Sequence, residues 1–204
     1  MTKVKLCGLT RFCDIDYANE IMPDFIGFVF APKSKRYVRF DEADKLRKKL
    51  NEGITPVGVF VDEKIENIEY LVSNNIISMV QLHGSEDSGY IEKLRNIVNC
   101  PIIQAFRIES KKDAARAEKS KADYIMLDSG GGTGITFNHL LIQNMKRDFF
   151  LAGGLDEENV REAILKCRPY AVDASSSLET NGVKDKNKMA AFVKAVRNGK
   201  EEVR

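Results

Sequence analysis

Eight short apolar runs recur along the chain, and each is followed by a polar turn and then by a stretch with helical spacing. Most of the runs are continuously apolar and do not alternate with polar residues, which is typical of parallel strands covered on both faces. We therefore predict eight buried parallel strands. They are Val4 to Cys7, Phe25 to Phe30, Val57 to Val61, Met79 to Leu82, Ile102 to Phe106, Tyr124 to Leu127, Phe149 to Ala152 and Tyr170 to Val172.

The segments between the runs predict helices. Apolar residues repeat at i, i+3, i+4 and i+7 from Val160 to Cys167 and again from Met189 to Val196, so one face of each helix is apolar. The segments around Ala114 and Leu140 show this pattern more weakly. Polar residues that can cap a first turn stand before five of the helices. The expected caps are Asp41, Ser85, Ser110, Asp156 and Asp185.

The alternation of eight strands with eight helical segments predicts an α/β fold built from right-handed βα units. Eight parallel strands close a (β/α)8 barrel, the TIM barrel. An open doubly wound sheet is left equally open by the pattern, because such barrels usually have about 250 residues and this chain has 204. No G-x-G-x-x-G follows the first strand, which counts slightly against a dinucleotide-binding sheet. No linker divides the chain, so we expect a single domain over residues 1–204.

Composition and charge narrow the classes of function. The 32 Lys and Arg residues nearly balance the 30 Asp and Glu residues, and the net charge of +2 is spread along the chain. This balance argues against a nucleic-acid or membrane surface. Four cysteines without a C-x-x-C pair, and only two histidines, do not predict a structural zinc site. The first residues lack the apolar segment of a signal peptide, which favours a cytoplasmic protein.

Cys7 ends the first run, and working residues of a parallel barrel lie at the carboxyl ends of its strands. Strand alternation places Lys5 on the same face as Cys7. If that face points into the barrel, the Lys5 ammonium can help to lower the pKa of the thiol and favour a thiolate. The alternative is that Cys7 is a small buried apolar residue, as most free cysteines are.

Asp128 directly follows the sixth run and is the second residue of the sequence LDSGGGTG, from Leu127 to Gly134. A carboxylate at such a position can simply cap a loop or accept hydrogen bonds, and this interpretation stays open. The glycines favour a binding site, because their backbone amides can approach an anion closely.

Two further loops are candidates for binding a phosphate. Gly153 and Gly154 follow the seventh run, and Ser175 and Ser176 follow the eighth. The loops after strands seven and eight form the recurrent phosphate site of TIM barrels, where backbone amides and a helix N-terminus meet the anion. Either loop alone could be no more than a tight turn, but the two together predict a phosphate ligand.

Three basic residues, Lys33, Lys35 and Arg36, follow the second run. Such cations are usually solvated, but the planar guanidinium of Arg36 can bind a carboxylate through two parallel hydrogen bonds. His83 directly follows the fourth run, where we expect a hydrogen-bonded structural residue more than a catalytic one.

Eight segments of the chain together resemble the phosphoribosylanthranilate isomerase family, barrel enzymes of tryptophan biosynthesis. They span nearly the whole chain in the family's order, and the combination is highly specific. Two positions depart from the family pattern, because Lys35 stands where a proline is usual and Ser177 where a glycine is more common. The matching segments are KLCGLTR (Lys5 to Arg11), GFVFAPKSKRYV (Gly27 to Val38), VGVFVDE (Val57 to Glu63), VQLHGSE (Val80 to Glu86), QAFRI (Gln104 to Ile108), LDSGGGTG (Leu127 to Gly134), FLAGGLDEENV (Phe150 to Val160) and VDASSSLETNGVKD (Val172 to Asp185).

The resemblance implies an enzyme that converts N-(5-phosphoribosyl)anthranilate, an aminoaldose, into the corresponding aminoketose without a metal or an organic cofactor. Carried onto this chain, Cys7 is the general base that removes the proton from C2 of the sugar. Asp128 is the general acid that protonates the furanose ring oxygen. The phosphate is expected on the loops after strands seven and eight, and the anthranilate carboxylate on Arg36.

This chemistry favours the closed barrel, because strands one and six face each other across a barrel and Cys7 and Asp128 can then flank one sugar. Two alternatives remain. A related isomerase of histidine biosynthesis acts on another phosphoribosyl substrate, but it typically uses two aspartates, and here Cys7 replaces the first. A non-enzymatic phosphate-binding or regulatory barrel would need neither Cys7 nor Asp128. We expect a small phosphoribosyl substrate as the partner, and no oligomeric state follows from the sequence.

Overall fold

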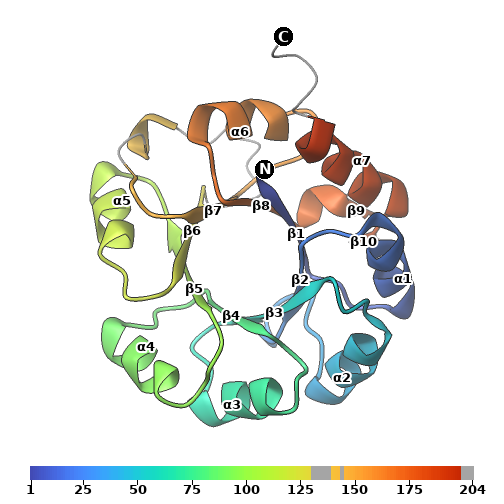
Figure 1. Ribbon diagram of the computed structural model, residues 1–204, viewed down its shortest axis with the longest axis horizontal. Coiled ribbons are helices and arrows are strands. Elements are labelled where there is room, and N and C mark those ends of the chain that lie inside the picture. Colours follow the sequence, from blue (N-terminus) through green and yellow to red (C-terminus); the bar gives the residue numbers. More distant parts are fainter. Residues whose placement is uncertain (130–138, 143–144, 199–204) are drawn as a thin grey trace.

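Eight parallel strands pair in sequence order and close into a barrel, because β8 also pairs with β1. The computed structural model describes residues 1–129, 139–142 and 145–198. In Figure 1 the strands surround the centre of the molecule and the helices lie outside them. The expected barrel is confirmed, and the open sheet is excluded. The strands are β1 (Lys3–Cys7), β2 (Phe25–Val29), β3 (Thr55–Phe60), β4 (Met79–Leu82), β5 (Ile102–Arg107), β6 (Tyr124–Asp128), β7 (Phe149–Ala152) and β8 (Ala171–Ala174).

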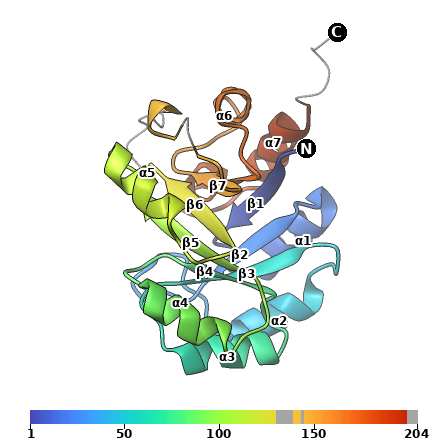
Figure 2. The ribbon, with the colours of Figure 1, turned by 60° about the vertical axis from the view of Figure 1, so that its left-hand side comes forward.

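Seven α-helices are present in the described residues, and Figure 2 shows α2, α3 and α4 covering the outer face of the neighbouring strands. The weak pattern around Ala114 forms α5, whereas the one around Leu140 forms only the short 3-10 helix η1. The elements are α1 (Phe12–Ile21), α2 (Phe40–Lys49), α3 (Ile65–Ser73), α4 (Ser88–Arg95), α5 (Lys111–Glu118), η1 (His139–Leu141), α6 (Val160–Cys167), η2 (Ser176–Leu178), the hairpin strands β9 (Glu179–Thr180) and β10 (Val183–Lys184), and α7 (Lys186–Arg197). None of the helices in the described ranges combines the length and hydrophobicity that crossing a bilayer requires.

Side-chain caps start several of these helices. Ser110 and Asp185 accept hydrogen bonds from backbone amides at the starts of α5 and α7, which confirms two of the expected caps. Asp156 accepts similar bonds from the amides of Glu158 and Asn159, in the turn that leads into α6. These bonds satisfy amides that a first helical turn leaves without partners.

Two of the expected caps are wrong. Asp41 lies inside α2, because the side chain of Glu42 accepts a hydrogen bond from the amide of Arg39 and starts the helix there. Ser85 lies before α4, whose cap is Asp87. In both places several polar residues compete within one turn, and sequence alone does not rank them.

The core is divided by the alternation of side chains along each strand, as β1 illustrates. Val4 and Leu6 pack between the strands and the helices, whereas Lys5 and Cys7 point into the barrel. An apolar layer around Phe25 fills the barrel interior near the amino ends of the strands. The opposite, carboxyl end is therefore where a ligand can enter.

Candidate active site

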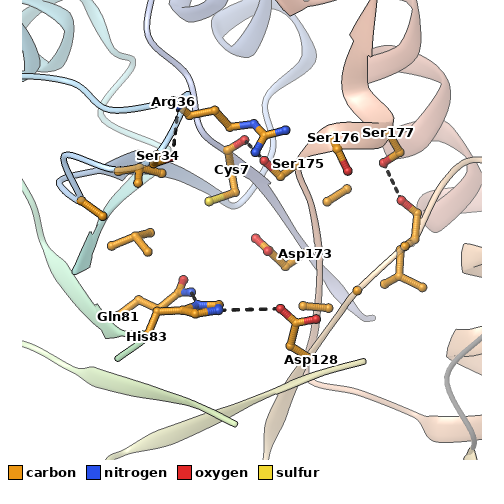
Figure 3. A pocket seen from close by; sticks show the side chains of 18 of the residues that line it. Cys7, Ser34, Arg36, Gln81, His83, Asp128, Asp173, Ser175, Ser176 and Ser177 are labelled. Atoms are coloured by element: carbon orange, nitrogen blue, oxygen red, sulfur yellow. Dashed lines mark hydrogen bonds and ion pairs between the residues drawn. The ribbon is translucent and has the colours of Figure 1, made fainter. Parts of the chain in front are cut away.

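A cavity of about 480 Å³ opens at the carboxyl ends of the strands. Its wall includes Cys7 of β1, Asp128 of β6 and Asp173 of β8. In Figure 3 Cys7 and Asp128 point into the cavity from opposite sides, with Asp173 between them. The two residues expected to be base and acid thus share one cavity, at the end of the barrel where TIM-barrel active sites lie.

The thiol of Cys7 occupies space that Gly27 leaves free on the neighbouring strand. Gly27 is the register partner of Cys7 on β2. A Cβ atom at Gly27 would lie 2.7 Å from Sγ of Cys7 and 3.2 Å from Nζ of Lys5. Any side chain at this position would displace the thiol or the ammonium group.

Lys5 and Asp173 form a buried ion pair beneath the thiol. The two residues are register partners on β1 and β8, and Nζ of Lys5 donates to Oδ1 of Asp173 at 2.7 Å. Lys5 is completely buried. A charge at this depth is tolerated because its partner is close and hydrogen-bonded. The pair therefore fixes a cation inside the barrel.

Burial raises the pKa of the Cys7 thiol, whereas the ammonium group of Lys5 acts in the opposite direction. Lys5 thus favours the thiolate, as its shared face predicts, but the expected net lowering is not found. The free-energy penalty of removing a thiolate from water is larger than the electrostatic stabilisation that Lys5 provides. Burial also opposes the charge on Lys5, but the attraction of Asp173 and Cys7 outweighs it and raises the pKa of Lys5.

Asp128 ends β6 at the cavity, and its carboxylate lies close to two other residues. Oδ2 of Asp128 is 3.7 Å from Nε2 of His83. Gly153, with φ of 95°, approaches so closely that a Cβ there would lie 2.7 Å from Oδ1 of Asp128. A side chain at position 153 would therefore clash with Ser129 and Asp128, and only glycine leaves room for both.

The two predicted phosphate loops meet on one part of the cavity wall. Gly153, Gly154, Ser175 and Ser176 all line it. The hydroxyl of Ser175 donates to the backbone oxygen of Cys7 at 3.0 Å, so this loop is tied to the end of β1. A Cβ at Gly154 would meet no atom within 4 Å, so Gly154 borders open space.

Arg36 also lines the cavity, whereas Lys33 and Lys35 are exposed outside it. Its Nε and Nη2 donate to both carboxylate oxygens of Glu179 at 2.5 and 2.9 Å. Glu179 also accepts from Nζ of Lys184 at 2.6 Å. The guanidinium of Arg36, which we expected to bind a substrate carboxylate, is therefore hydrogen-bonded to the carboxylate of Glu179.

Arg36 and Glu179 form a small charged cluster with Lys184. Burial opposes the charge on Glu179, but hydrogen bonds from Arg36 and Lys184 outweigh it and hold the pKa of Glu179 below its ordinary value. The three side chains together carry one net positive charge, so the cluster can still attract an anion.

Sequence reasoning missed Asp173, Glu179 and Lys184 as parts of the site. Asp173 stands at a predicted strand end, but its pairing with Lys5 follows only from closure of the barrel between β8 and β1. Gln81 was also missed, although it stands two residues before His83 and alternation alone places both on one face. His83 is hydrogen-bonded to Gln81, as expected of a structural residue, but it also lines the cavity.

Part of the predicted site lies outside the described residues, namely the glycine loop from Gly130 to Gly134. Among the residues that the structure does describe, no group of three or more His, Cys, Asp or Glu side chains is arranged to hold a metal ion.

Comparison with known proteins identifies the family. The family model described as "N-(5'phosphoribosyl)anthranilate (PRA) isomerase" matches residues 4–195. The N-(5'-phosphoribosyl)anthranilate isomerase of Endomicrobium trichonymphae is 43% identical over 203 residues, which cover 97% of this chain and all of the relative. That of Caldanaerobacter subterraneus is 45% identical over 204 residues, which cover 97% and 98% of the two chains.

The fold agrees with solved structures of the same enzymes. The phosphoribosylanthranilate isomerase of Thermotoga maritima superposes with a TM-score of 0.88 at 37% identity, over 96% of this chain and 98% of the other. A structure of such an isomerase in complex with reduced 1-(o-carboxyphenylamino)-1-deoxyribulose 5-phosphate superposes with a TM-score of 0.85 at 36% identity, over the same shares. The chain therefore belongs to the N-(5'-phosphoribosyl)anthranilate isomerase family.

Proposed function

We propose that Cys7 is the general base and Asp128 the general acid of the family's reaction in this chain. The chain is an isomerase of N-(5'-phosphoribosyl)anthranilate in tryptophan biosynthesis. Its reaction is an Amadori rearrangement, which gives 1-(o-carboxyphenylamino)-1-deoxyribulose 5-phosphate. The assignment of the two residues is supported by one observation above all, that both side chains point into a single cavity from opposite sides.

The reaction begins at the furanose ring. Asp128 donates a proton to the ring oxygen as the bond between this oxygen and C1 breaks, and the nitrogen lone pair forms a C1=N bond. This iminium group makes the C2 proton acidic. An acid placed at the ring oxygen contributes about 10² to 10⁴ in rate, because it neutralises charge as the charge develops.

Cys7 then removes the C2 proton as a thiolate. The electrons of the C2–H bond form a C1=C2 bond, and the C1=N bond becomes single. The resulting enol becomes the ketone when C1 takes up a proton and the C2 hydroxyl releases one. All electrons stay within the substrate, so the balance of the reaction requires no external oxidant or reductant.

Lys5 supports the base in this scheme. Its ammonium group favours the thiolate of Cys7 against the cost of burial, and Asp173 holds the ammonium in place. The thiolate is then paired with a fixed cation at the moment when it must accept a proton.

The two anionic ends of the substrate are assigned to separate parts of the cavity wall. We place the phosphate at the loops of Gly153 and Gly154 and of Ser175 and Ser176, which line the cavity and whose backbone amides would bind the anion. We place the anthranilate carboxylate at Arg36. Since Nε and Nη2 face Glu179, the carboxylate would use Nη1 and the net positive charge of the cluster.

The small phosphoribosyl substrate is the partner that this site requires, and we place the reaction in the cytoplasm. All four cysteines are free thiols, which fits a reducing compartment.

A turnover assay tests the proposal. Phosphoribosylanthranilate is generated in situ, and the loss of its fluorescence is followed with and without the protein. The wild type should accelerate the loss, whereas Cys7→Ser and Asp128→Asn should each lower kcat by at least about 10², the typical effect of losing an acid or base. Cys100→Ser, which removes a thiol that does not line the cavity, serves as the control. Near-normal turnover in either site variant would remove that residue from the mechanism.

A further inference from the structure

Two side chains beside the acid form a hydrogen-bonded pair. Gln81 lies on β4, and His83 is the first residue after this strand. Because the two residues are two positions apart, both side chains point toward the barrel interior. Nε2 of Gln81 lies 3.0 Å from Nδ1 of His83, and Nε2 of His83 lies 3.7 Å from Oδ2 of Asp128. Figure 3 shows the three side chains in a row along one side of the cavity.

The orientation of the Gln81 amide decides which ring nitrogen of His83 carries a proton. Nε2 of Gln81 also lies 3.3 Å from Sδ of Met126, and a thioether sulfur can only accept a hydrogen bond. In the structure Gln81 presents its NH₂ group to His83, while its own Oε1 is buried without a hydrogen-bond partner among the described residues. A neutral imidazole that accepts at Nδ1 carries its proton on Nε2, the nitrogen that faces Asp128.

We propose that Gln81 is a positioning residue that holds His83 neutral, with its proton on Nε2, and so keeps an imidazolium away from Asp128. An imidazolium would carry a second hydrogen on Nδ1, directed at the NH₂ group of Gln81. Two donors would then face each other, and Gln81 is only 2% exposed, so water cannot separate them.

The charge on His83 affects the proton that Asp128 must donate. An imidazolium beside Asp128 would stabilise its carboxylate and oppose proton donation, whereas a neutral ring adds no positive charge there. This inference rests on the proposed role of Asp128. Two other charged residues lie near His83 and Asp128: Asp173 of β8 interacts electrostatically with both, and Arg107 of β5 is the register partner of Asp128.

The protonation state can be read directly by ¹⁵N NMR of the imidazole side chains. The chain has two histidines, and the variant His139→Gln assigns their signals. In the free wild-type enzyme at neutral pH, His83 should carry its proton on Nε2 and have a bare Nδ1. The variant Gln81→Glu has nearly the same shape but offers an acceptor, so it should protonate Nδ1.

Kinetics separate this role from a merely structural one. Gln81→Glu should lower kcat at neutral pH by at least about tenfold, a partial loss of general-acid catalysis. The alkaline limb of the kcat profile should move to lower pH, while KM changes by less than about twofold because ground-state binding is kept. Gln104→Glu is the matched control, because Gln104 of β5 bonds to Glu86 and Ser120 and does not line the cavity. It should leave the His83 signals and kcat unchanged.

A proton on Nδ1 of His83 in the wild type would overturn the proposal. So would a Gln81→Glu variant that keeps the wild-type tautomer and pH profile. If Gln81→Glu does not fold, Gln81→Met decides, because loss of the donor should give a mixture of both tautomers and an unchanged single tautomer would contradict the role. The NMR result is obtained without substrate, so its failure is distinct from failure of the proposed acid, which Asp128→Asn tests by turnover.

Discussion

The proposed base and the proposed acid lie in different surroundings on the two sides of the cavity. Cys7 is only 7% exposed and sits above the fully buried Lys5, which is paired with Asp173. On the other side, the side chains of His83 and Asp128 are 39% and 21% exposed. A buried ion pair keeps its charges fixed, whereas exposed groups exchange protons with water. We infer that the fold itself supplies the cation that favours the thiolate of the base, and that the acid takes up its proton from solvent after each turnover.

The largest effect is expected from breaking the ion pair on the base side. Lys5→Met would leave Asp173 buried without its cation, which should lower the free energy of unfolding by about 3 to 5 kcal/mol. Urea unfolding followed by circular dichroism measures this loss. The matching change on the exposed side, His83→Gln, should cost much less stability, because water can solvate what remains.

The double variant Lys5→Met/Asp173→Leu is the control for this prediction. It replaces the pair with apolar side chains and should recover most of the stability without recovering activity, since Cys7 has lost its cation. If Lys5→Met alone is as stable as the wild type, the base side is not held by this pair.

Arg36 extends the comparison, because it adds a third cation, besides Lys5 and Lys184, on the side of Cys7. Arg36→Met should weaken the binding of anthranilate-bearing ligands by about 1.5 to 3 kcal/mol, the scale of a hydrogen bond to a charged group. Affinity for a simple ribose phosphate should be nearly unchanged, and calorimetric titration of both ligands measures the difference. Equal losses for the two ligands would show that Arg36 acts through loop structure or general charge.

A smaller effect should distinguish the two neighbouring glycines. Both have positive φ, so an alanine at either position costs about 1 to 2 kcal/mol of backbone energy. Gly153→Ala also presses a methyl group against Ser129 and Asp128, which displaces the carboxylate and should lower kcat, whereas Gly154→Ala borders the proposed phosphate position and should mainly raise KM. Steady-state kinetics separate the two outcomes, and the same kcat and KM changes in both variants would contradict the division.

Much of this architecture could be predicted from the sequence, because each strand is buried on both faces and appears as a continuous apolar run. The strand ends then located Cys7 and Asp128 without any coordinates. The charged pairs could not be found in this way. Lys5 and Asp173 are 168 positions apart, and Arg36 and Glu179 are 143 apart, so only the closed barrel brings them together.

Two further properties of the site, the pKa of Cys7 and the partner of Arg36, also could not be predicted from the sequence. The shared face of Lys5 and Cys7 indicated that Lys5 can help to lower the pKa of the thiol, and Lys5 does act in this direction, but the sequence could not show that burial of the thiol is the larger effect. Arg36 was predicted to bind a ligand carboxylate, but the sequence could not show that β9 brings Glu179 to the same guanidinium. Both effects depend on contacts between elements that are distant in the chain.

The central claim, that Cys7 removes the C2 proton after Asp128 has opened the ring, is tested most directly with substrate carrying deuterium at C2 of the ribose. In Cys7→Ser the slowed step is the removal of this proton, so kcat should show a primary isotope effect. In Asp128→Asn the slowed step is ring opening, which breaks no bond to C2, so deuterium should leave kcat unchanged. The opposite pattern, or an equal isotope effect in both variants, would contradict the assignment of base and acid.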